Sequence, residues 1–340
     1  MSPEATHSGD LGPEATAGGP LGLGPEATHS GDLGPEATAS VLTQALPYIQ
    51  RFSGATVVVK YGGSALDDDH LARFAADIVL MASVGIRPVV VHGGGPQIGE
   101  MMQRLGLQPR FVDGLRVTDA ETLDIARMVL VGRVNRDIVS AINVHGPRAV
   151  GVSGEDAGLI TARAQSPELG FVGTVDSVNT AIIDRLLDER LIPVVSTIGA
   201  DATGQALNIN ADTVAGILAG ALGAAKAVFL TDVEGLYADP DDPTTLISET
   251  TAADLDEMIA AGTLSGGMIP KAEAAVHAVR HGVASAHMVN GTTPHVLLLE
   301  LFTDAGVGTM VRPDPDPESA DRHHPDSDPE THDPAKEAAP

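Results

Sequence analysis

The sequence predicts an α/β fold in which a mostly parallel, open sheet lies between two layers of helices. Short apolar runs alternate with segments of helical periodicity along residues 41–312, and two of these runs end in glycine-rich turns. Strands buried on both faces form continuous apolar runs, and the helices that connect parallel strands cover both faces of the sheet. We therefore expect a three-layer αβα sandwich with two lobes.

The first half of this core is expected to alternate between strands and helices. Runs of three valines favour strands, and the segments that follow them have apolar residues at helical spacing. The elements expected in chain order are a strand at 56–60, a helix at 66–83, a strand at 87–92, a helix at 96–105, two helices at 119–131 and 133–144, and a strand at 149–153.

The second half adds a hairpin to this alternation. Residues 159–164 and 170–178 are strand-like and are separated by polar residues, which indicates a β-hairpin that forms a lid or a substrate pocket. The remaining expected elements are a helix at 180–189, a strand at 192–197, a helix at 210–221, a strand at 227–232, helices at 252–261 and 270–281, and a strand at 285–290.

Both ends of the chain lack the residues that a core needs. Residues 3–17 recur letter for letter at 25–39 and contain no aromatic residue, so we predict that residues 1–40 form a disordered leader. The tail at 313–340 is rich in Pro, Asp, Glu and His, and we predict that it is solvated and disordered. Between them we expect a helix at 41–53 and a domain at 54–312.

Charge and composition exclude several classes of function. The net charge of −26 argues against a nucleic-acid partner, because phosphate binding needs clustered Lys and Arg. Without cysteine the chain can form neither disulfides nor thiolate metal sites. No apolar run is long enough to span a bilayer, and no export signal is recognisable, so we expect a cytoplasmic protein without membrane contact.

Two glycine-rich turns are the most informative feature of the chain. Lys60-Tyr61-Gly62-Gly63 and His92-Gly93-Gly94-Gly95-Pro96 each follow a predicted strand, at the edge of a parallel sheet where ligands bind. Such turns present backbone N–H groups to anions. The chain has only four lysines, and Lys60 and Lys271 each lie beside a glycine turn. Two ammonium groups on one anion suit phosphoryl transfer, although Lys60 could equally just end a strand.

Three further stretches carry candidate residues, each with a structural alternative. Arg116, in the stretch 113–119, could bind a carboxylate or form a surface ion pair with Asp113 or Asp119. Residues 208–212 (NINAD) precede a predicted helix that Asn208 or Asn210 could cap, and Asp212 could hold nearby lysines. Residues 230–237 could border a nucleotide or merely form the exit from a strand.

Together these motifs resemble the amino acid kinase family over about residues 42–312. The stretches KYGGSA, VVVHGGGPQI, DGLRVTD, LNINADTVAG, LTDVEGLY and GGMIPKAEAA occur in the family's order and at fitting separations. A Walker P-loop and a protein-kinase catalytic loop are both absent from the sequence. The resemblance implies transfer of the γ-phosphoryl group of ATP, with Mg²⁺, to the γ-carboxylate of N-acetyl-L-glutamate in arginine synthesis. It also implies an acyl-amino-acid lobe at about 54–225 and an ATP lobe at about 226–312.

The resemblance implies a role for each matching residue. Lys60 and Lys271 would stabilise the transition state, and Asp212 would organise both. Magnesium would be carried by the ATP phosphates, without a metal site of the protein itself. The residues implied for the acyl amino acid are Gly94, Gly95, Arg116 and Asn208. Those implied for ATP are Gly63, Thr231, Asp232, Gly235, Tyr237, Gly267 and Met268.

The resemblance extends to regulation. Members that arginine inhibits have an extra N-terminal helix that links dimers into a hexamer, and residues 41–51 resemble that helix, with Pro47 expected to kink or end it. The residues implied for arginine are Tyr48, His287, Glu300 and Gly306. From the residues alone, His287 could instead face solvent from a strand, and Glu300 could lie at an exposed helix end.

Three positions depart from the family's pattern, and two other functions stay open. Glu155, Ala157 and Thr174 stand where lysine, glycine and glutamate are usual, which bears on fine substrate preference. The alternatives are a sister kinase for another acidic acyl-amino acid or a carrier-bound aminoadipate, and a catalytically silent arginine sensor.

Overall fold

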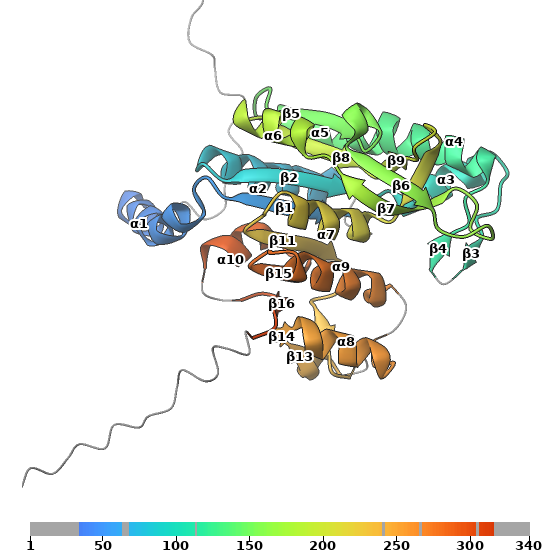
Figure 1. The fold of residues 1–340 in the computed structure, drawn as a ribbon. Coiled ribbons are helices and arrows are strands. Elements are labelled where there is room, and N and C mark those ends of the chain that lie inside the picture. Colours follow the sequence, from blue (N-terminus) through green and yellow to red (C-terminus); the bar gives the residue numbers. More distant parts are fainter. Residues whose placement is uncertain are drawn as a thin grey trace, which may run out of the picture. The chain divides into compact units, whose positions relative to one another are not determined.

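The computed structural model describes residues 34–62, 68–112, 114–239, 242–264, 267–303 and 306–315. Its central feature is an eight-stranded sheet with the order β14-β16-β15-β11-β1-β2-β8-β5, which runs from the bottom to the top of Figure 1. The strands in this order are β14 (Glu249–Thr251), β16 (Thr309–Arg312), β15 (Ser285–Asn290), β11 (Lys226–Thr231), β1 (Thr56–Tyr61), β2 (Arg87–His92), β8 (Ile192–Ser196) and β5 (Ala149–Ser153).

The six strands from β15 to β5 are parallel, as the alternating pattern predicts. In this sheet, as far as the structure describes it, β16 runs antiparallel to β15 and parallel to β14. Because β1 pairs with β11, the predicted lobe boundary near residue 225 falls between two neighbouring strands of one sheet. The assignment of one ligand to each lobe stays a prediction.

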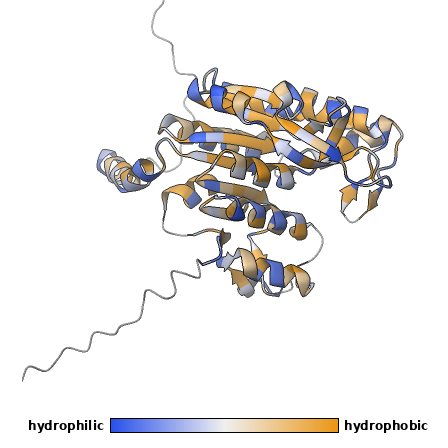
Figure 2. Ribbon diagram, viewed as in Figure 1, coloured by the Kyte–Doolittle hydropathy of each residue, from blue (hydrophilic) through white to orange (hydrophobic). Residues whose placement is uncertain are grey.

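Helices cover both faces of the sheet, which confirms the three-layer architecture. Alternate residues of β1 point to opposite faces, so Val58 packs in one hydrophobic cluster while Val57 and Val59 pack in the other. Figure 2 shows hydrophobic residues along the strands of this sheet. The first cluster includes α6 (Ala181–Asp188), α7 (Ala211–Ala221), α8 (Ala252–Ala260) and α9 (Met268–Arg280). The second includes α2 (Asp68–Ser83), α3 (Gly95–Arg104), α4 (Ala120–Val129), α5 (Asn135–Asn143) and α10 (Val296–Phe302).

Smaller strands flank the main sheet. The predicted hairpin is confirmed as β6 (Ile160–Ala164) and β7 (Val172–Val178), which pair antiparallel. Two strands that the sequence did not indicate, β9 (Ile198–Ala200) and β10 (Ala206–Ile209), close with them into a four-stranded barrel. Two further hairpins are β3 (Phe111–Val112) with β4 (Leu115–Arg116), and β12 (Leu236–Tyr237) with β13 (Leu246–Ile247). Short 3₁₀ turns lie at Asp156–Gly158 and Pro243–Thr245.

The prediction of two separate helices at 119–131 and 133–144 is wrong. A π-helical turn at Leu130–Val134 joins α4 directly to α5, so the chain stays helical across both predicted ranges. A π turn inserts one residue into the helix and shifts its apolar pattern, which is why the periodicity indicated a break at this point. The predicted start of α4 is supported by its cap, because Asp119 accepts a hydrogen bond from the Thr122 N–H.

The predicted boundary between leader and N-terminal helix is also wrong. Helix α1 spans Pro35–Phe52, so residues 35–40, which were assigned to the disordered leader, are helical. Pro35 suits the first turn of a helix, and Glu36 complements the helix dipole there. The helix also continues through Pro47, because a proline removes one hydrogen bond without preventing the neighbouring residues from staying helical. The rest of the predicted leader, residues 1–33, and the tail from residue 316 lie outside the described residues.

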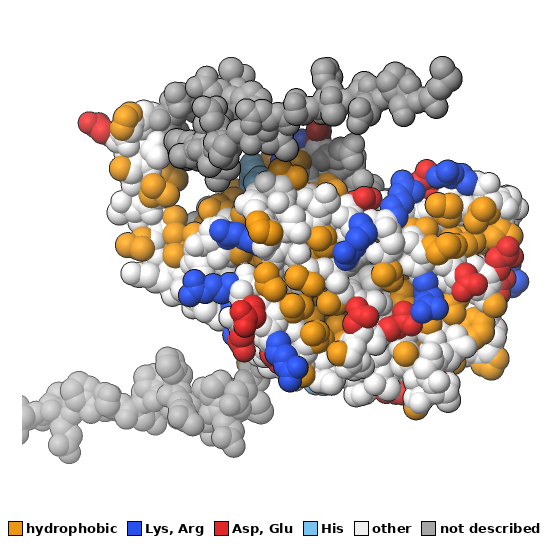
Figure 3. All heavy atoms as spheres, turned by 90° about the horizontal axis from the view of Figure 1, so that it is seen from above, with side chains coloured by type: hydrophobic (Ala, Val, Ile, Leu, Met, Phe, Trp, Pro, Cys, Tyr) orange, Lys and Arg blue, Asp and Glu red, His pale blue; other side chains and the backbone are white. Residues whose placement is uncertain are grey.

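The surface of the described chain mixes charges of both signs. On the face seen in Figure 3, basic and acidic side chains are interspersed, and no large patch of one sign forms there. No helix within the described ranges is long and apolar enough to cross a membrane.

Candidate active site

The two predicted glycine turns meet at one edge of the sheet. Strands β1 and β2 are parallel neighbours with Tyr61 opposite His92, so both turns begin at the same level. The absence of a Cβ at Gly62 leaves room for Lys60, whose Nζ would lie 3.2 Å from such an atom. The edge therefore combines the backbone of the glycine turns with the ammonium group of Lys60, as the sequence predicts.

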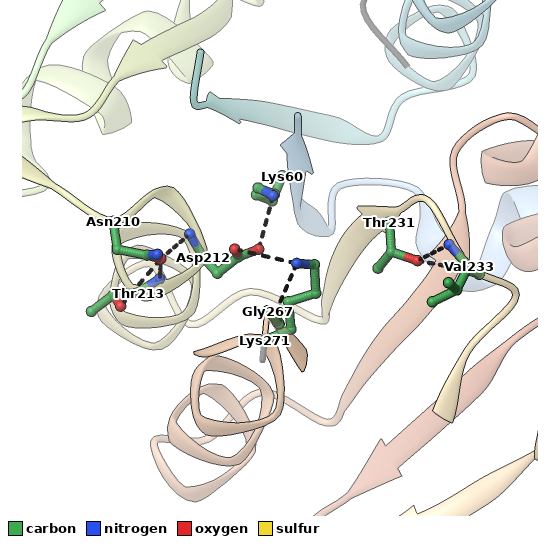
Figure 4. A network of polar contacts seen from close by, with 8 residues as sticks. All are labelled: Lys60, Asn210, Asp212, Thr213, Thr231, Val233, Gly267 and Lys271. Carbon is green, nitrogen blue, oxygen red and sulfur yellow. Dashed lines mark hydrogen bonds and ion pairs between the residues drawn. The ribbon is translucent and has the colours of Figure 1, made fainter. Parts of the chain in front are cut away.

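Asp212 brings the two lysines together. It lies in the first turn of α7, where Asn210 caps the helix by accepting hydrogen bonds from the N–H groups of Asp212 and Thr213. Its Oδ1 is 3.0 Å from Lys60 Nζ, and its Oδ2 is 4.0 Å from Lys271 Nζ. Figure 4 shows both ammonium groups directed toward this carboxylate from β1 and α9.

The charge of this cluster favours an anion. Lys60 and Asp212 are both only 6% exposed, so water screens their charges weakly. The three side chains carry two positive charges against one negative charge, so the cluster has an excess of one positive charge. Lys271 is held from the other side by a hydrogen bond to the carbonyl of Gly267 (3.0 Å). The arrangement can stabilise negative charge that spreads over phosphoryl oxygens.

A cavity of about 280 Å³ opens beside the cluster. Its lining includes every residue predicted for the acyl amino acid, together with Lys60 and Asp212. These predicted residues are Gly94, Gly95, Arg116 and Asn208. Strands β1, β4 and β10, the turn after β2 and helix α7, which are far apart in the sequence, therefore contribute to one hollow.

Arg116 is fixed at the rim of this cavity. Its Nη2 donates to the carbonyl of Gly95 (2.8 Å), and its guanidinium lies over the ring of Phe111. Burial lowers the pKa of Arg116 below its ordinary value. The alternative of an ion pair with Asp119 is wrong, because Asp119 caps α4 instead; Asp113 lies outside the described residues.

Asn208 is a strand residue and not a helix cap. It lies in β10, and its side-chain amide donates to Thr118 Oγ1 at 3.4 Å. The residue that caps α7 is Asn210, so the capping alternative holds for Asn210 and not for Asn208.

The residues predicted for ATP that the structure describes follow the strand β11 or lie near its end, and none of them lines the cavity. Thr231 ends β11, and its hydroxyl donates to the carbonyl of Val233 (2.5 Å), as Figure 4 shows. Gly235 is required by packing, because a Cβ there would be 2.6 Å from Thr309 Oγ1. Asp232 follows β11, Tyr237 lies in β12, and Gly267 and Met268 begin α9. Gly63 lies outside the described residues.

A second buried charge cluster contains two of the residues predicted for arginine. Glu300 Oε1 is 2.8 Å from His287 Nδ1 and 2.9 Å from Lys226 Nζ. His287 is 1% and Glu300 8% exposed, so the solvent-facing alternatives for both residues are wrong. Tyr48 lies on α1, and Gly306 lies between α10 and β16.

The protonation of this cluster follows from burial and pairing. Burial lowers the pKa of His287, although Glu300 opposes the shift. Burial alone would raise the pKa of Glu300, but the hydrogen bond from His287 and the charge of Lys226 bring it below its ordinary value.

Lys226 was not among the predicted site residues. Its only signal in the sequence is that lysine is scarce and that Lys226 begins a buried strand.

The departures from the family's pattern have local structural consequences. Glu155 forms an ion pair with Arg127 at 3.0 Å, and Ala157 has a φ of 53°, in the left-handed region that favours glycine. Thr174 lies in β7 opposite Arg163. None of the three lines the cavity of the described residues.

Comparison with known proteins gives a consistent result. Residues 55–290 match the amino acid kinase family. The chain is 54% identical over 273 residues to an acetylglutamate kinase of Nostoc sp., which covers 80% of this chain and 92% of the relative. A Synechocystis sp. acetylglutamate kinase is 53% identical over the same length, with 80% and 92% covered.

Solved structures share the fold. An N-acetylglutamate synthase from Neisseria gonorrhoeae, complexed with coenzyme A and N-acetyl-glutamate, superposes with a TM-score of 0.72 at 29% identity. The match covers 82% of this chain and 64% of the synthase chain. A carbamate kinase from Giardia lamblia bound to AMP-PNP has a TM-score of 0.57 at 18% identity, with 77% and 99% covered, and is similar in fold alone.

Proposed function

The chain belongs to the amino acid kinase family, and we propose on this basis that it transfers the γ-phosphoryl group of ATP to the γ-carboxylate of N-acetyl-L-glutamate. The product is N-acetyl-L-glutamyl 5-phosphate, an intermediate of arginine biosynthesis. The observation that carries the proposal is the buried Lys60–Asp212–Lys271 cluster beside a cavity lined by Arg116 and a glycine turn. The 54% identity to a curated acetylglutamate kinase supports the choice of substrate.

The reaction needs charge stabilisation more than proton transfer. A carboxylate is already ionised at neutral pH, so its oxygen can attack the γ-phosphorus without a general base, while the bond to the ADP oxygen breaks. The main barrier is repulsion between two anions. Lys60 and Lys271 offset this charge, Asp212 holds both ammonium groups, and the Gly94 N–H meets a phosphoryl oxygen. Mg²⁺ is held by the phosphates of ATP and neutralises further charge when it is bound.

The remaining binding roles follow the same chemistry. Arg116 pairs with the α-carboxylate of the acyl amino acid, and Asn208 hydrogen-bonds its amide-like atoms. ATP lies along the ends of β11 and β12 and the start of α9, over Thr231, Asp232, Gly235, Tyr237, Gly267 and Met268, with Gly63 of the first turn at its phosphates.

Replacing Arg116 by alanine is expected to raise the KM for N-acetyl-L-glutamate by roughly 10- to 100-fold, because a charged hydrogen bond is worth about 1.5–3 kcal/mol. The KM for ATP should change little. Steady-state kinetics with each substrate varied in turn measure both values. Arg104→Ala, which removes an exposed arginine at the end of α3, is the control. An unchanged KM for the acyl substrate in R116A would contradict the assignment of Arg116.

A hydroxamate assay for acyl phosphate tests the proposal itself. The reaction contains the full chain, ATP, Mg²⁺ and N-acetyl-L-glutamate, with unacetylated glutamate as the control substrate. Product that depends on the acetyl group supports the proposal. If no product forms, N-acetyl-2-aminoadipate in place of N-acetyl-L-glutamate distinguishes a sister kinase from a silent arginine sensor, and calorimetry with arginine then identifies the sensor.

Regulation by arginine is a further part of the proposal. The buried carboxylate of Glu300 is the natural partner of a guanidinium, and the predicted arginine site combines it with His287, Tyr48 and Gly306. Helix α1 carries Tyr48 and assembles the chain into a hexamer, a trimer of dimers.

Glu300→Gln is expected to abolish most arginine inhibition, because the amide keeps the shape of the side chain but loses its charge. The arginine concentration that halves activity should rise at least roughly 10-fold, as for the loss of a charged hydrogen bond. Activity without arginine should stay within about twofold, since Glu300 does not line the cavity. Glu249→Gln, at an exposed ion pair with Arg312, is the control. Unchanged inhibition of E300Q would contradict this site.

A further inference from the structure

His92 is a buried histidine that directly precedes the second glycine turn. Its side chain is inaccessible to solvent, and its Nδ1 lies 2.9 Å from the carbonyl oxygen of Gly93. Its Nε2 lies 3.0 Å from Nδ2 of Asn135. A carbonyl oxygen only accepts hydrogen bonds, so Nδ1 carries the proton and Nε2 accepts from the Asn135 amide. Burial lowers the pKa of His92 to about 4, so the ring is neutral at neutral pH.

Asn135 is itself locked in one orientation. Its amide nitrogen donates both to His92 and to the carbonyl of Val194 (2.8 Å), and its oxygen accepts from Arg136. A flipped amide would place its oxygen against the carbonyl oxygen of Val194, which is repulsive. Gly151 in β5 leaves room for this arrangement, because a Cβ there would overlap both Asn135 and Arg136.

The π turn places Asn135 against His92. It spans Leu130–Val134 and ends directly before Asn135. The same turn packs on the glycine turn, because a Cβ on Gly94 would be 2.7 Å from Leu130 and 3.2 Å from Val134. π turns inside helices are frequent at functional sites, where they redirect side chains. Here the π turn contacts the glycine turn through Leu130 and Val134, and it ends directly before Asn135, the partner of His92.

The bond to Gly93 determines where the next N–H group points. In a trans peptide, the carbonyl of Gly93 and the N–H of Gly94 belong to one plane and point in opposite directions. Since the carbonyl is directed at the imidazole, the Gly94 N–H is directed away from it. Gly93 N–H donates to Tyr61, whereas among the described residues none accepts a backbone hydrogen bond from Gly94, which lines the cavity.

We infer that His92 and Asn135 form a positioning pair that aims the Gly94 N–H at the transferred phosphoryl group. The inference rests on the proposed function, in which that N–H meets a phosphoryl oxygen in the transition state. His92 touches no reacting atom and acts only through the Gly93–Gly94 peptide. The pair therefore affects kcat more than substrate affinity, because a preorganised donor contributes most where negative charge develops.

Two isosteric variants separate positioning from packing. In His92→Asn, the side-chain amide nitrogen takes the place of Nδ1 and keeps a donor for the Gly93 carbonyl. In His92→Gln, the side-chain oxygen takes the place of Nε2 and keeps an acceptor for Asn135, but the donor to Gly93 is lost. H92Q is expected to lower kcat by roughly 10- to 100-fold, with both KM values within about threefold, whereas H92N keeps kcat within about fivefold. Melting temperatures should fall by similar amounts in both.

Several outcomes would overturn the inference. These are equal loss of kcat in H92N and H92Q, a loss that follows the melting temperature, and a change confined to KM. A wild-type chain without activity in the hydroxamate assay overturns the proposed function and the catalytic part of this inference with it.

The hydrogen-bond geometry of His92 has its own test in ¹⁵N NMR of the histidine-labelled full chain, with the His92 signals assigned through H92N. A neutral ring protonated at Nδ1 is expected at pH 7, and a ring protonated at Nε2 or at both nitrogens would contradict the network.

Discussion

Lys60→Ala is expected to lower kcat by at least about 10²-fold, the loss typical of removing one transition-state donor from a buried site. Lys60 is 6% exposed and lines the cavity in an ion pair with Asp212, so bulk water has little access to solvate the developing negative charge once the ammonium group is removed. Lys271→Ala should have an effect of the same kind, since Lys271 approaches Asp212 from the other side. Initial rates of acyl phosphate formation at saturating ATP and N-acetyl-L-glutamate measure the effect.

Lys226→Ala is a matched control for this experiment. The side chain of Lys226 is only 11% exposed and, like that of Lys60, forms an ion pair with a buried carboxylate, here Glu300, but it does not line the cavity. Both substitutions remove a buried cation, so a general loss of stability should appear in both, whereas the loss of kcat should be confined to K60A. Near-wild-type turnover in K60A would remove Lys60 from the chemistry.

Asp212→Asn is expected to lower both stability and turnover. The carboxylate is buried between two ammonium groups, and removing one partner of a buried ion pair typically costs about 3–5 kcal/mol. Without the negative charge the two lysines repel each other and lose their common anchor, so kcat should fall by roughly 10- to 100-fold. Circular dichroism at increasing temperature and initial rates well below the transition measure the two effects separately.

A double-mutant cycle tests whether Asp212 acts through the lysines. If it does, the logarithmic losses of K60A and D212N should not add, because the second substitution removes a contact that the first has already broken. Asp201→Asn, at a partly exposed aspartate in the turn before β10, is the control for a lost carboxylate. Strictly additive losses of K60A and D212N would indicate that Asp212 has a separate role.

Much of the fold could be predicted because its strands and helices have strong local patterns. The strands 87–92, 149–153 and 285–290 have the predicted bounds, since short and largely apolar runs between turns are typical of buried strands. The short strands β9 and β10 and the helix α10 were missed. Their residues adopt these conformations through pairing with β6 and β7 and through packing on α2, which no local pattern records. The π turn was missed because its inserted residue shifts the helical period.

The candidate site was predictable only in part. Lysines, glycines and an aspartate in recognisable motifs indicated phosphoryl transfer, and the structure places Lys60, Asp212 and Lys271 within ion-pair distance. No motif indicated Lys226 or Asn135, and His92 was noted only as the first residue of the second glycine turn. Lys226 is 74 residues from its partner Glu300, and Asn135 is 43 residues from His92. Contacts between residues so far apart in the sequence depend on the order of strands in the sheet and not on the residues adjacent to them in the chain.

The sequence by itself determined the layered α/β architecture, the order of its main strands and helices, and the residues of the kinase motifs, because these depend on local periodicity and on turn chemistry. The tertiary structure alone decided which charges are buried and paired. Burial turned Glu300 and His287 from surface candidates into a closed cluster with Lys226, and it made the neutral imidazole of His92 a donor to the glycine turn. The physical reason is that the strength of a charge or a hydrogen bond depends on how far water is excluded, and that is a property of the packed chain.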